Sequence, residues 1–167
     1  SGLYHADRIV AISHKVKDTL VGEYGVDSNK IEVIHNGKTS DMRFNDISPE
    51  NFKIKKSDKI VLYAGRVTIQ KGPDYFVEGA AKVLKKKKDV KFIIAGTGDM
   101  LNQLIRRVAE LGISDKFIFH GFYTREEGAK FFKMADVFVM PSVSEPFGLV
   151  PFEAMMSDTS SIISKQS

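Results

Sequence analysis

The sequence has no cysteine, and none of its apolar runs approaches the length of a membrane span. Without cysteine the chain forms neither disulfides nor thiolate metal sites. No signal peptide is visible, and we therefore expect a cytoplasmic protein. No aromatic residues are interleaved with the basic run Lys85-Lys86-Lys87-Lys88, which argues against a nucleic-acid site. The run is typical of a solvated helix end, so we expect no nucleic acid as partner.

The composition that is present is that of a globular domain. Hydrophobic residues make up 43% and charged residues 28% of 167 positions, with a net charge of +4. This length suffices for one domain with a substantial core, or for one domain and part of another. Residue 1 is Ser rather than Met, and we expect a fragment of a longer protein.

From residue 59 onward, short apolar runs alternate with amphipathic segments. The runs predict five buried strands, and the segments between them predict four helices. The expected strands are 59–64, 90–95, 117–119, 137–140 and 161–163, and the expected helices are 74–86, 101–111, 125–134 and 149–156. Strands joined by crossover helices form a parallel sheet with both faces covered. With right-handed crossovers, the pattern predicts a doubly wound, Rossmann-like α/β domain.

The N-terminal residues form a smaller unit. Residues 8–12 and 31–34 indicate strands, and residues 15–24 indicate a helix between them. Because a lone strand–helix–strand cannot bury both faces of its strands, we interpret residues 1–37 as the end of a second domain and residues 38–167 as the main domain. The stretch from 39 to 58 is polar and separates the two. We expect the unmatched strands to pair between chains, which predicts some self-association.

Four strand-to-helix junctions carry polar or glycine residues, and parallel strands bring all four to one edge of the sheet. The first junction contains Gly65-Arg66 and Lys71-Gly72. Arg66 offers a planar charged fork and Lys71 a compact point charge. Such a pair suits a diphosphate, because both cations can stabilise charge on a departing phosphate. Two surface cations on a loop are the ordinary alternative, which this junction alone leaves open.

The second and third junctions are less specific. Gly96-Thr97-Gly98-Asp99 suits either a tight turn or a close backbone approach to a nucleotide. It lacks the third glycine of a dinucleotide fingerprint and does not follow the first strand, which excludes NAD. In His120-Gly121-Phe122-Tyr123 the aromatic rings lie either near a base or over the core. His120 has no visible ligand partner, which favours a structural role for it.

The fourth junction, Glu145-Pro146-Phe147-Gly148-Leu149-Val150-Pro151-Phe152-Glu153-Ala154, is the most informative. Two glutamates eight residues apart flank a glycine-containing turn that leads into a helix. Backbone N–H groups at a helix start favour phosphate, and carboxylates beside them can hold sugar hydroxyls. The alternative is that Glu153 complements the helix dipole and Glu145 is solvated. The Pro-Phe-Gly turn between them favours a nucleotide-sugar site.

Other notable residues favour structural roles. Phe131, Phe132 and Met134 follow helical spacing and are expected in the core, together with Met155-Met156. His14 and His35 are far apart in the sequence and show no metal-ligand pattern.

These motifs resemble those of the retaining glycosyltransferases of family 4, also called group 1, which have the two-domain GT-B fold. The resemblance covers nearly the whole chain. It includes Ala6 to Ser13, Val33 to Gly37, the glycine junctions and Pro141 to Ala154, with Glu145 and Glu153 as the two-glutamate signature. It implies that residues 1–37 are a remnant of the acceptor-binding N-terminal domain and that 38–167 are most of the donor-binding domain. After Glu153 the family's glycine and Thr-Pro are absent, since the chain reads Met156-Ser157-Asp158-Thr159-Ser160.

The resemblance also implies roles for single residues. Arg66, Lys71 and Glu145 would be catalytic, with the cations on the donor diphosphate and Glu145 on the transferred sugar. Donor binding would involve Gly65, Gly96, Gly98, Gly121, Phe122, Phe147, Gly148, Leu149 and Glu153, the last on the ribose hydroxyls. No metal and no cofactor is expected beyond the nucleotide-diphosphate-sugar donor. The acceptor, a glycan, a lipid or a small molecule, is not specified, and the other domain leaves peripheral membrane attachment open.

We therefore expect a retaining, hexosyltransferase-like enzyme as the parent protein, with this chain binding the donor and inactive alone, because domain closure completes such a site. A nucleotide-sugar binding module without catalysis, or one subunit of a split glycosyltransferase, is the alternative. A glycoside hydrolase using Glu145 and Glu153 as acid and base would leave Arg66 and Lys71 without a phosphate. A nucleotide-sugar epimerase of the same fold is excluded only by the family motifs.

Overall fold

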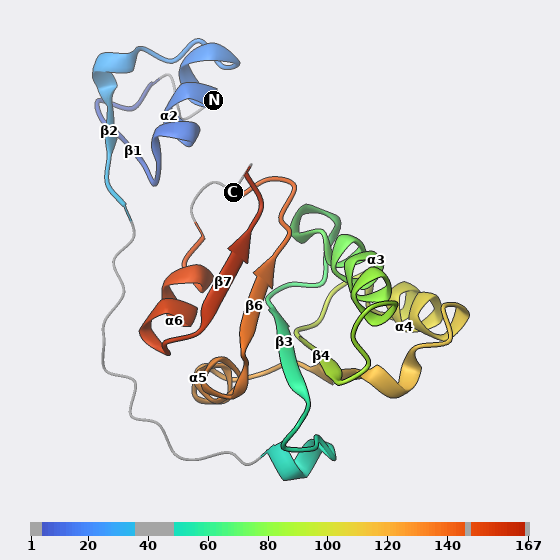
Figure 1. Cartoon of the computed structure of the whole chain (residues 1–167). Helices are drawn as coiled ribbons and strands as arrows, with labels where there is room; N and C mark the ends of the chain where they lie inside the picture. The colour runs from blue at the N-terminus through green and yellow to red at the C-terminus, as the bar shows by residue number, and fades with distance from the viewer. Residues whose placement is uncertain (1–4, 36–48, 146–147, 166–167) are drawn as a thin grey trace. The chain divides into compact units, whose positions relative to one another are not determined.

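A computed structural model describes residues 5–35, 49–145 and 148–165 of the chain (Figure 1). Contacts divide these residues into two compact units. The smaller contains residues 5–35 together with 148–149, and the larger contains residues 49–145 and 150–165.

The smaller unit is the predicted strand–helix–strand. Strand β1 (Ile9–Ala11) pairs in parallel with β2 (Ile31–Val33), and helix α2 (His14–Gly22) connects them. Ser13 caps α2, because its Oγ accepts a hydrogen bond from the Val16 N–H at 3.2 Å. Caps of this kind satisfy one of the unpaired donors in the first helical turn.

The strands of the smaller unit are covered on one side. A short 3-10 helix, η1 (Ser28–Lys30), leads into β2. The small core consists of Ala11, Val26 and Ile31. Val10 points away from this core and is 59% exposed. Within the described residues, one face of these strands is therefore uncovered.

The larger unit has five strands and four helices, each within two residues of its predicted bounds. The strands are β3 (Lys59–Ala64), β4 (Val90–Ala95), β5 (Phe117–Gly121), β6 (Val137–Met140) and β7 (Ser160–Ile163), and the helices are α3 (Pro73–Leu84), α4 (Leu101–Glu110), α5 (Arg125–Met134) and α6 (Val150–Met156). All described pairings are parallel, in the order β5-β4-β3-β6-β7. This arrangement confirms the doubly wound, Rossmann-like fold.

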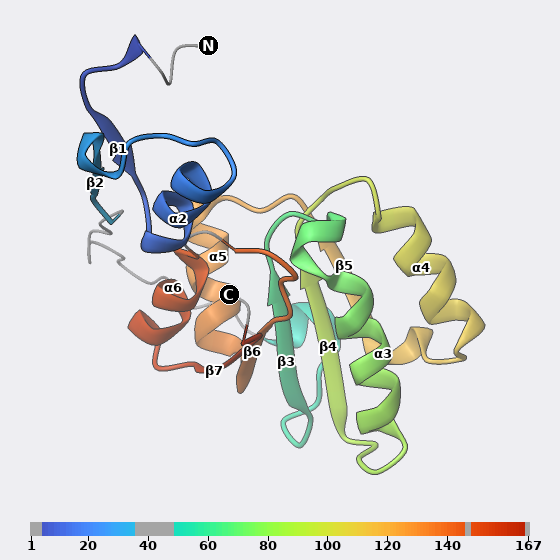
Figure 2. The ribbon, with the colours of Figure 1, turned by 90° about the horizontal axis from the view of Figure 1, so that it is seen from above.

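The helices cover the sheet in two layers, with α3 and α4 on one face and α5 and α6 on the other (Figures 1 and 2). Side chains of a strand alternate between these faces. Leu62 and Ala64 belong to the core under α5 and α6, whereas Tyr63 belongs to the core under α3 and α4. In the second of these cores the rings of Phe92 and Phe117 stack with centroids 5.2 Å apart.

The strand order reverses between β3 and β6, which makes the carboxyl ends of these two strands the natural ligand crevice. Asp136 joins β3 and β6 at their opposite, amino ends. Its carboxylate accepts hydrogen bonds from the Ile60 N–H and the Lys59 ammonium, both at 2.8 Å. Burial would raise the pKa of Asp136, but the hydrogen bonds from Lys59 and Ile60 outweigh it and lower that pKa below its ordinary value.

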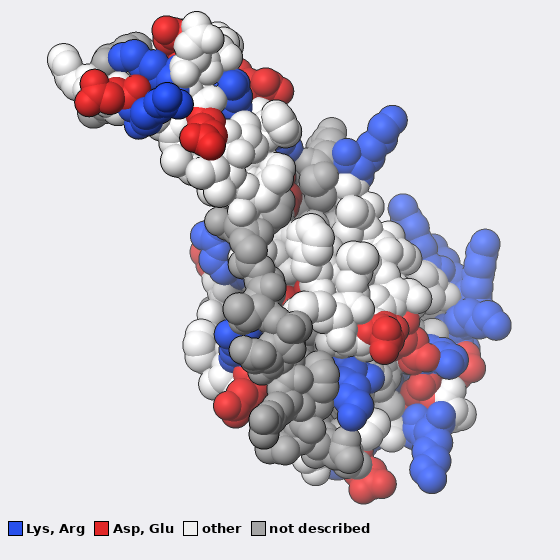
Figure 3. Space-filling view, turned by 90° about the vertical axis from the view of Figure 1, so that its left-hand side faces the viewer, with Lys and Arg blue, Asp and Glu red and all other residues white. Residues whose placement is uncertain are grey.

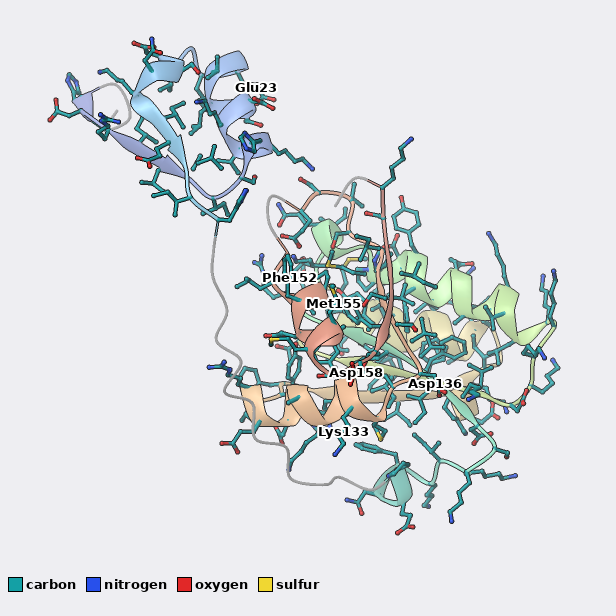
Figure 4. The ribbon with its side chains drawn as sticks, turned by 60° about the vertical axis from the view of Figure 1, so that its left-hand side comes forward. Glu23, Lys133, Asp136, Phe152, Met155 and Asp158 are labelled. Atoms are coloured by element: carbon teal, nitrogen blue, oxygen red, sulfur yellow. The ribbon has the colours of Figure 1, made fainter. Side chains whose placement is uncertain are left out.

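Two local expectations were wrong. In the stretch predicted to be a polar separator, η2 (Pro49–Phe52) forms and Ile54 is buried against the core under α5. Met155 and Met156 are 65% and 36% exposed, because α6 contacts the core through Ala154 instead. Met155 lies on the outer side of α6 (Figure 4). On this side of the molecule, uncharged side chains lie between scattered acidic and basic ones (Figure 3).

The turn after α6 forms without the family's glycine. Asp158 takes that turn with a φ of +55°, a left-handed conformation that Asp adopts more readily than most residues (Figure 4). Thr159 is buried and its hydroxyl donates to the Phe132 carbonyl at 2.6 Å. This hydrogen bond ties the turn to α5.

Candidate functional site

The junctions after β3 and β4 continue the sheet's hydrogen bonding beyond the strands. The Gly65 N–H donates to the Ala95 carbonyl at 3.0 Å, and the Val67 N–H donates to the Thr97 carbonyl at 2.8 Å. Further along the first junction, η3 (Ile69–Lys71) leads into α3. The first and second junctions are therefore joined by backbone hydrogen bonds, and we call this hydrogen-bonded surface the platform.

Gly96 is glycine because the first junction passes directly over it. A Cβ at Gly96 would lie 1.8 Å from the Gly65 carbonyl oxygen, and Gly96 has a φ of +146°. A Cβ at Gly98 would likewise lie 2.2 Å from the Val67 carbonyl oxygen. Contact between two loops thus explains both glycines, a reason that differs from the tight turn and from the nucleotide approach considered in the sequence. In front of Gly65 the space is open.

The third and fourth junctions join the same platform. The Gly96 N–H donates to the Gly121 carbonyl at 2.7 Å, and the Val143 N–H donates to the Gln70 carbonyl at 2.9 Å. All four junctions lie at the carboxyl ends of the parallel strands, as the sequence predicted.

A pocket of about 440 Å³ opens at this edge of the sheet. Its walls come from the first three junctions and from the start of α6: Gly65, Arg66, Lys71, Gly96, Thr97, Phe122, Tyr123 and Val150. The structure therefore brings five of the predicted site residues together around one cavity. Its volume is within the range of small-ligand sites.

The two predicted cations differ in their surroundings. The Lys71 ammonium forms an ion pair with the Glu145 carboxylate, and the two side chains are only 19% and 8% exposed. The Arg66 side chain is exposed and has neither a hydrogen-bond nor an ion-pair partner within the described part of the chain. Arg66 is thus the uncompensated positive charge of the pocket.

The backbone of Arg66 is held by a hydrogen bond from a buried side chain. Tyr63 is 2% exposed, and its hydroxyl donates to the Arg66 carbonyl at 2.7 Å. Burial raises the pKa of Tyr63, with Tyr123 and Asp74 adding to the shift. The hydroxyl therefore keeps its proton and acts as a donor.

The aromatic side of the pocket is held by the start of α5. Thr124 and Glu127 form a capping box, with hydrogen bonds of 2.7 Å and 3.3 Å between their side chains and backbone N–H groups. Tyr123 packs against Phe131, whereas Phe122 is 75% exposed. Burial also raises the pKa of Tyr123.

His120 has the structural role expected for it. Its ring packs edge-on against Phe131 with centroids 4.6 Å apart. Among the residues with described positions, no group of three or more His, Cys, Asp or Glu is arranged to hold a metal ion.

The remaining predicted residues within the described ranges are not among the walls of the pocket. Gly98 belongs to a supporting loop, Gly121 is the last residue of β5, and Glu153 lies in the first turn of α6. Contacts group Gly148 and Leu149 with the smaller unit, so their role stays a prediction. Phe147 lies outside the described residues.

Sequence reasoning assigned no role to the wall residue Thr97 or to the anchor Tyr63. It placed the Tyr123 ring near a base or over the core, and it directed the Val150 backbone at an anion. Thr97 lies between two glycines and Tyr123 follows Phe122, so both were within quoted motifs. The contact of Tyr63 depends on the path of the chain after β3, which no sequence pattern reveals.

Comparisons with known proteins agree over both units. Residues 44–167 match the family described as glycosyl transferases group 1, and residues 1–38 match glycosyltransferase family 4. The chain is 33% identical to an uncharacterized glycosyltransferase of Methanocaldococcus jannaschii, over 96% of this chain and 43% of that protein. It is 34% identical to the D-inositol 3-phosphate glycosyltransferase of Mycolicibacterium smegmatis, over 92% of this chain and 36% of that protein.

Solved structures share the fold. Anabaena HepE in complex with UDP and glucose superposes with a TM-score of 0.85 at 20% identity, covering 97% of this chain and 45% of that one. Sucrose-phosphate synthase from Thermosynechococcus elongatus gives a TM-score of 0.81 at 25% identity, covering 98% of this chain and 42% of that one. The chain spans less than half the length of each of these proteins. No helix in the described ranges is long and apolar enough to cross a membrane.

Proposed function

This chain belongs to the glycosyl transferases of group 1, and from that premise we propose that its larger unit binds a nucleotide-diphosphate-sugar donor for transfer to an acceptor, with retention. The observation that carries this proposal is the exposed, uncompensated Arg66 in a pocket that also contains Lys71. A planar guanidinium binds phosphate oxygens in a bidentate manner. The donor's diphosphate is the group that this pocket suits best.

We assign different residues of the site to the diphosphate, the sugar and the base of the donor. Arg66 and Lys71 stabilise the charge that develops on the diphosphate as the bond from the sugar carbon to the phosphate oxygen breaks. We assign Glu145, which is paired with Lys71, to contact with the transferred sugar. The exposed ring of Phe122 offers a face on which a nucleobase can stack.

The comparisons support the class of donor. The relatives are named glycosyltransferases, and the HepE structure contains UDP and glucose. Because the chain spans less than half of these proteins, we propose that it binds the donor and does not complete transfer alone. A second domain that closes over the donor would supply the acceptor site.

Isothermal titration calorimetry tests the proposal with UDP, GDP and ADP, each compared with its nucleoside. At least one diphosphate should bind more tightly than its nucleoside. Arg66→Gln should weaken that diphosphate about 10- to 100-fold, the range for hydrogen bonds to charged groups, and leave the nucleoside unchanged. Arg106→Gln on α4 is the matched control, since Arg106 is exposed and lies outside the pocket.

Phe122→Ala separates the base from the phosphate. It should weaken the nucleoside and the diphosphate by the same factor, because stacking is common to both. If no diphosphate binds more tightly than its nucleoside, the proposed function is wrong.

A further inference from the structure

The geometry points to Tyr63 as a positioning residue. We propose that its buried hydroxyl fixes the peptide group after Arg66 and thereby aims the guanidinium into the pocket. This inference rests on the proposed function, because it concerns how the diphosphate is recognised. Tyr63 itself lies in the core and does not line the pocket.

The peptide group between Arg66 and Val67 is held at both ends. Its carbonyl oxygen accepts the Tyr63 hydroxyl at 2.7 Å, and its N–H donates to the Thr97 carbonyl at 2.8 Å. Bonds at both ends prevent this peptide plane from rotating. The direction of the Arg66 Cα–Cβ bond, which depends on the adjoining backbone dihedrals, is fixed as a result.

The peptide groups of Ala64–Gly65 and Val67–Thr68, before and after this segment, are held as well. The Gly65 N–H donates to the Ala95 carbonyl at 3.0 Å, and the Val67 carbonyl accepts the Met100 N–H at 3.1 Å. These bonds are all made between backbone groups. The Tyr63 hydroxyl is therefore the side-chain contribution to this part of the platform, and it can be removed without altering the backbone donors and acceptors.

The ring and the hydroxyl of Tyr63 have separable tasks. The ring is buried and tilts against Phe76 with centroids 5.7 Å apart. A phenylalanine at this position would fill the same space and keep that contact. A buried hydroxyl needs a hydrogen-bond partner, and the Arg66 carbonyl is the partner it has.

The arrangement matters because the Arg66 side chain has no partner of its own within the described ranges. A long charged side chain without contacts samples many rotamers, and ordering it on a ligand opposes binding. Fixing the backbone leaves the side-chain torsions free, but it fixes the point and the direction from which the side chain extends into the pocket. Electrostatic groups that are already oriented stabilise charge most effectively.

Tyr63→Phe tests the inference in the intact chain. The ratio of the nucleoside and diphosphate dissociation constants should fall about three- to tenfold, the equivalent of one neutral hydrogen bond. Ile94→Val is the matched control, because Ile94 is fully buried in the same core and does not line the pocket. That variant loses core packing and should keep the ratio of the wild type.

A double-mutant cycle with Arg66→Gln identifies the group through which Tyr63 acts. If the hydroxyl acts by orienting Arg66, Tyr63→Phe should cause no further change in the ratio once the guanidinium is gone. Amide hydrogen exchange gives an independent readout. If the two variants are equally stable, the Val67 N–H should exchange faster in Tyr63→Phe than in Ile94→Val. In Tyr63→Phe the peptide group of this N–H has lost the hydrogen bond to its carbonyl oxygen, one of its two hydrogen bonds.

The outcomes are distinct. An unchanged ratio in Tyr63→Phe, with wild-type preference for the diphosphate intact, overturns the positioning role and leaves the proposed function standing. Equal weakening of nucleoside and diphosphate, or a further fall in the double variant, also overturns it, because either result places the effect away from Arg66. A wild-type chain that does not prefer any diphosphate overturns both proposals together.

Discussion

Glu145→Gln should destabilise the larger unit, although Glu145 was first noticed as a functional residue. The Glu145 side chain is 8% exposed and is paired with Lys71, which is 19% exposed. Removing one partner leaves the other charge in a poorly solvated place. Breaking a fully buried pair costs about 3–5 kcal/mol, and because Lys71 lies at the wall of an open pocket we expect about 2–3 kcal/mol.

Urea denaturation of four proteins measures this effect: the wild type, Glu145→Gln, Lys71→Met and the double variant. Each single variant should lose stability, and the double variant should recover to within about 1 kcal/mol of the wild type because no unpaired charge remains. Glu78→Gln is the control. It breaks the Arg107–Glu78 ion pair, in which both side chains are nearly half exposed, and should change stability little.

Ligand binding adds a second readout. A diphosphate that contacts Lys71 replaces the missing negative charge, so it should stabilise Glu145→Gln more than it stabilises the wild type. Equal stability of the wild type and Glu145→Gln without ligand would refute the buried ion pair. Equal ligand-induced stabilisation would refute contact between Lys71 and the diphosphate.

Three further variants test the fold around the site. Gly96→Ala should lower the free energy of unfolding by more than about 3 kcal/mol, because the added Cβ meets the Gly65 carbonyl. Gly121→Ala should lower it by about 1 kcal/mol, because the added Cβ has open space and only the φ of +83° is unfavourable. The opposite order of urea midpoints would contradict this. Asp158→Gly should raise stability by about 0.5–1 kcal/mol in thermal denaturation by relieving a left-handed φ of +55°; a lower melting temperature would argue against it. Asp136→Asn should cost about 1 kcal/mol at pH 7. Because the pKa of Asp136 is lowered from 3.8, its contribution is present above that value and is lost as the pH falls below it; a cost unchanged at pH 3 would refute this.

The sheet could be predicted from sequence because each strand is signalled locally. Residues 60–64 and 137–140 are continuous apolar runs with β-branched residues, the pattern of strands buried on both faces. The burial of Ile54 could not be foreseen, because Phe52 and Ile54 among lysines are too few apolar residues to define a period. Met155 was misplaced for a related reason, since α6 has only seven residues and too few turns to define its buried side.

The candidate site was predictable where a side chain's chemistry is visible in its residue type. Arg66 and Lys71 were chosen for charge, and both line the pocket. The ion pair between Lys71 and Glu145 was not predicted, because it joins residues 74 positions apart. For Gly96 the sequence offered a turn or a ligand approach, and the contact with the Gly65 carbonyl is a third reason that only the folded chain reveals.

The ion pair of Lys71 with Glu145 gives Lys71 and Arg66 different roles, although both lie in one loop. A diphosphate that enters the pocket meets its first uncompensated charge at Arg66, whereas Lys71 is already neutralised by Glu145. Arg66 therefore attracts the diphosphate more strongly than Lys71 does, because a diphosphate that contacts Lys71 must compete with the Glu145 carboxylate. Since a weakly held cation gains most from a new anion, the donor's binding energy should depend more on Arg66, and its alignment beside Glu145 more on Lys71.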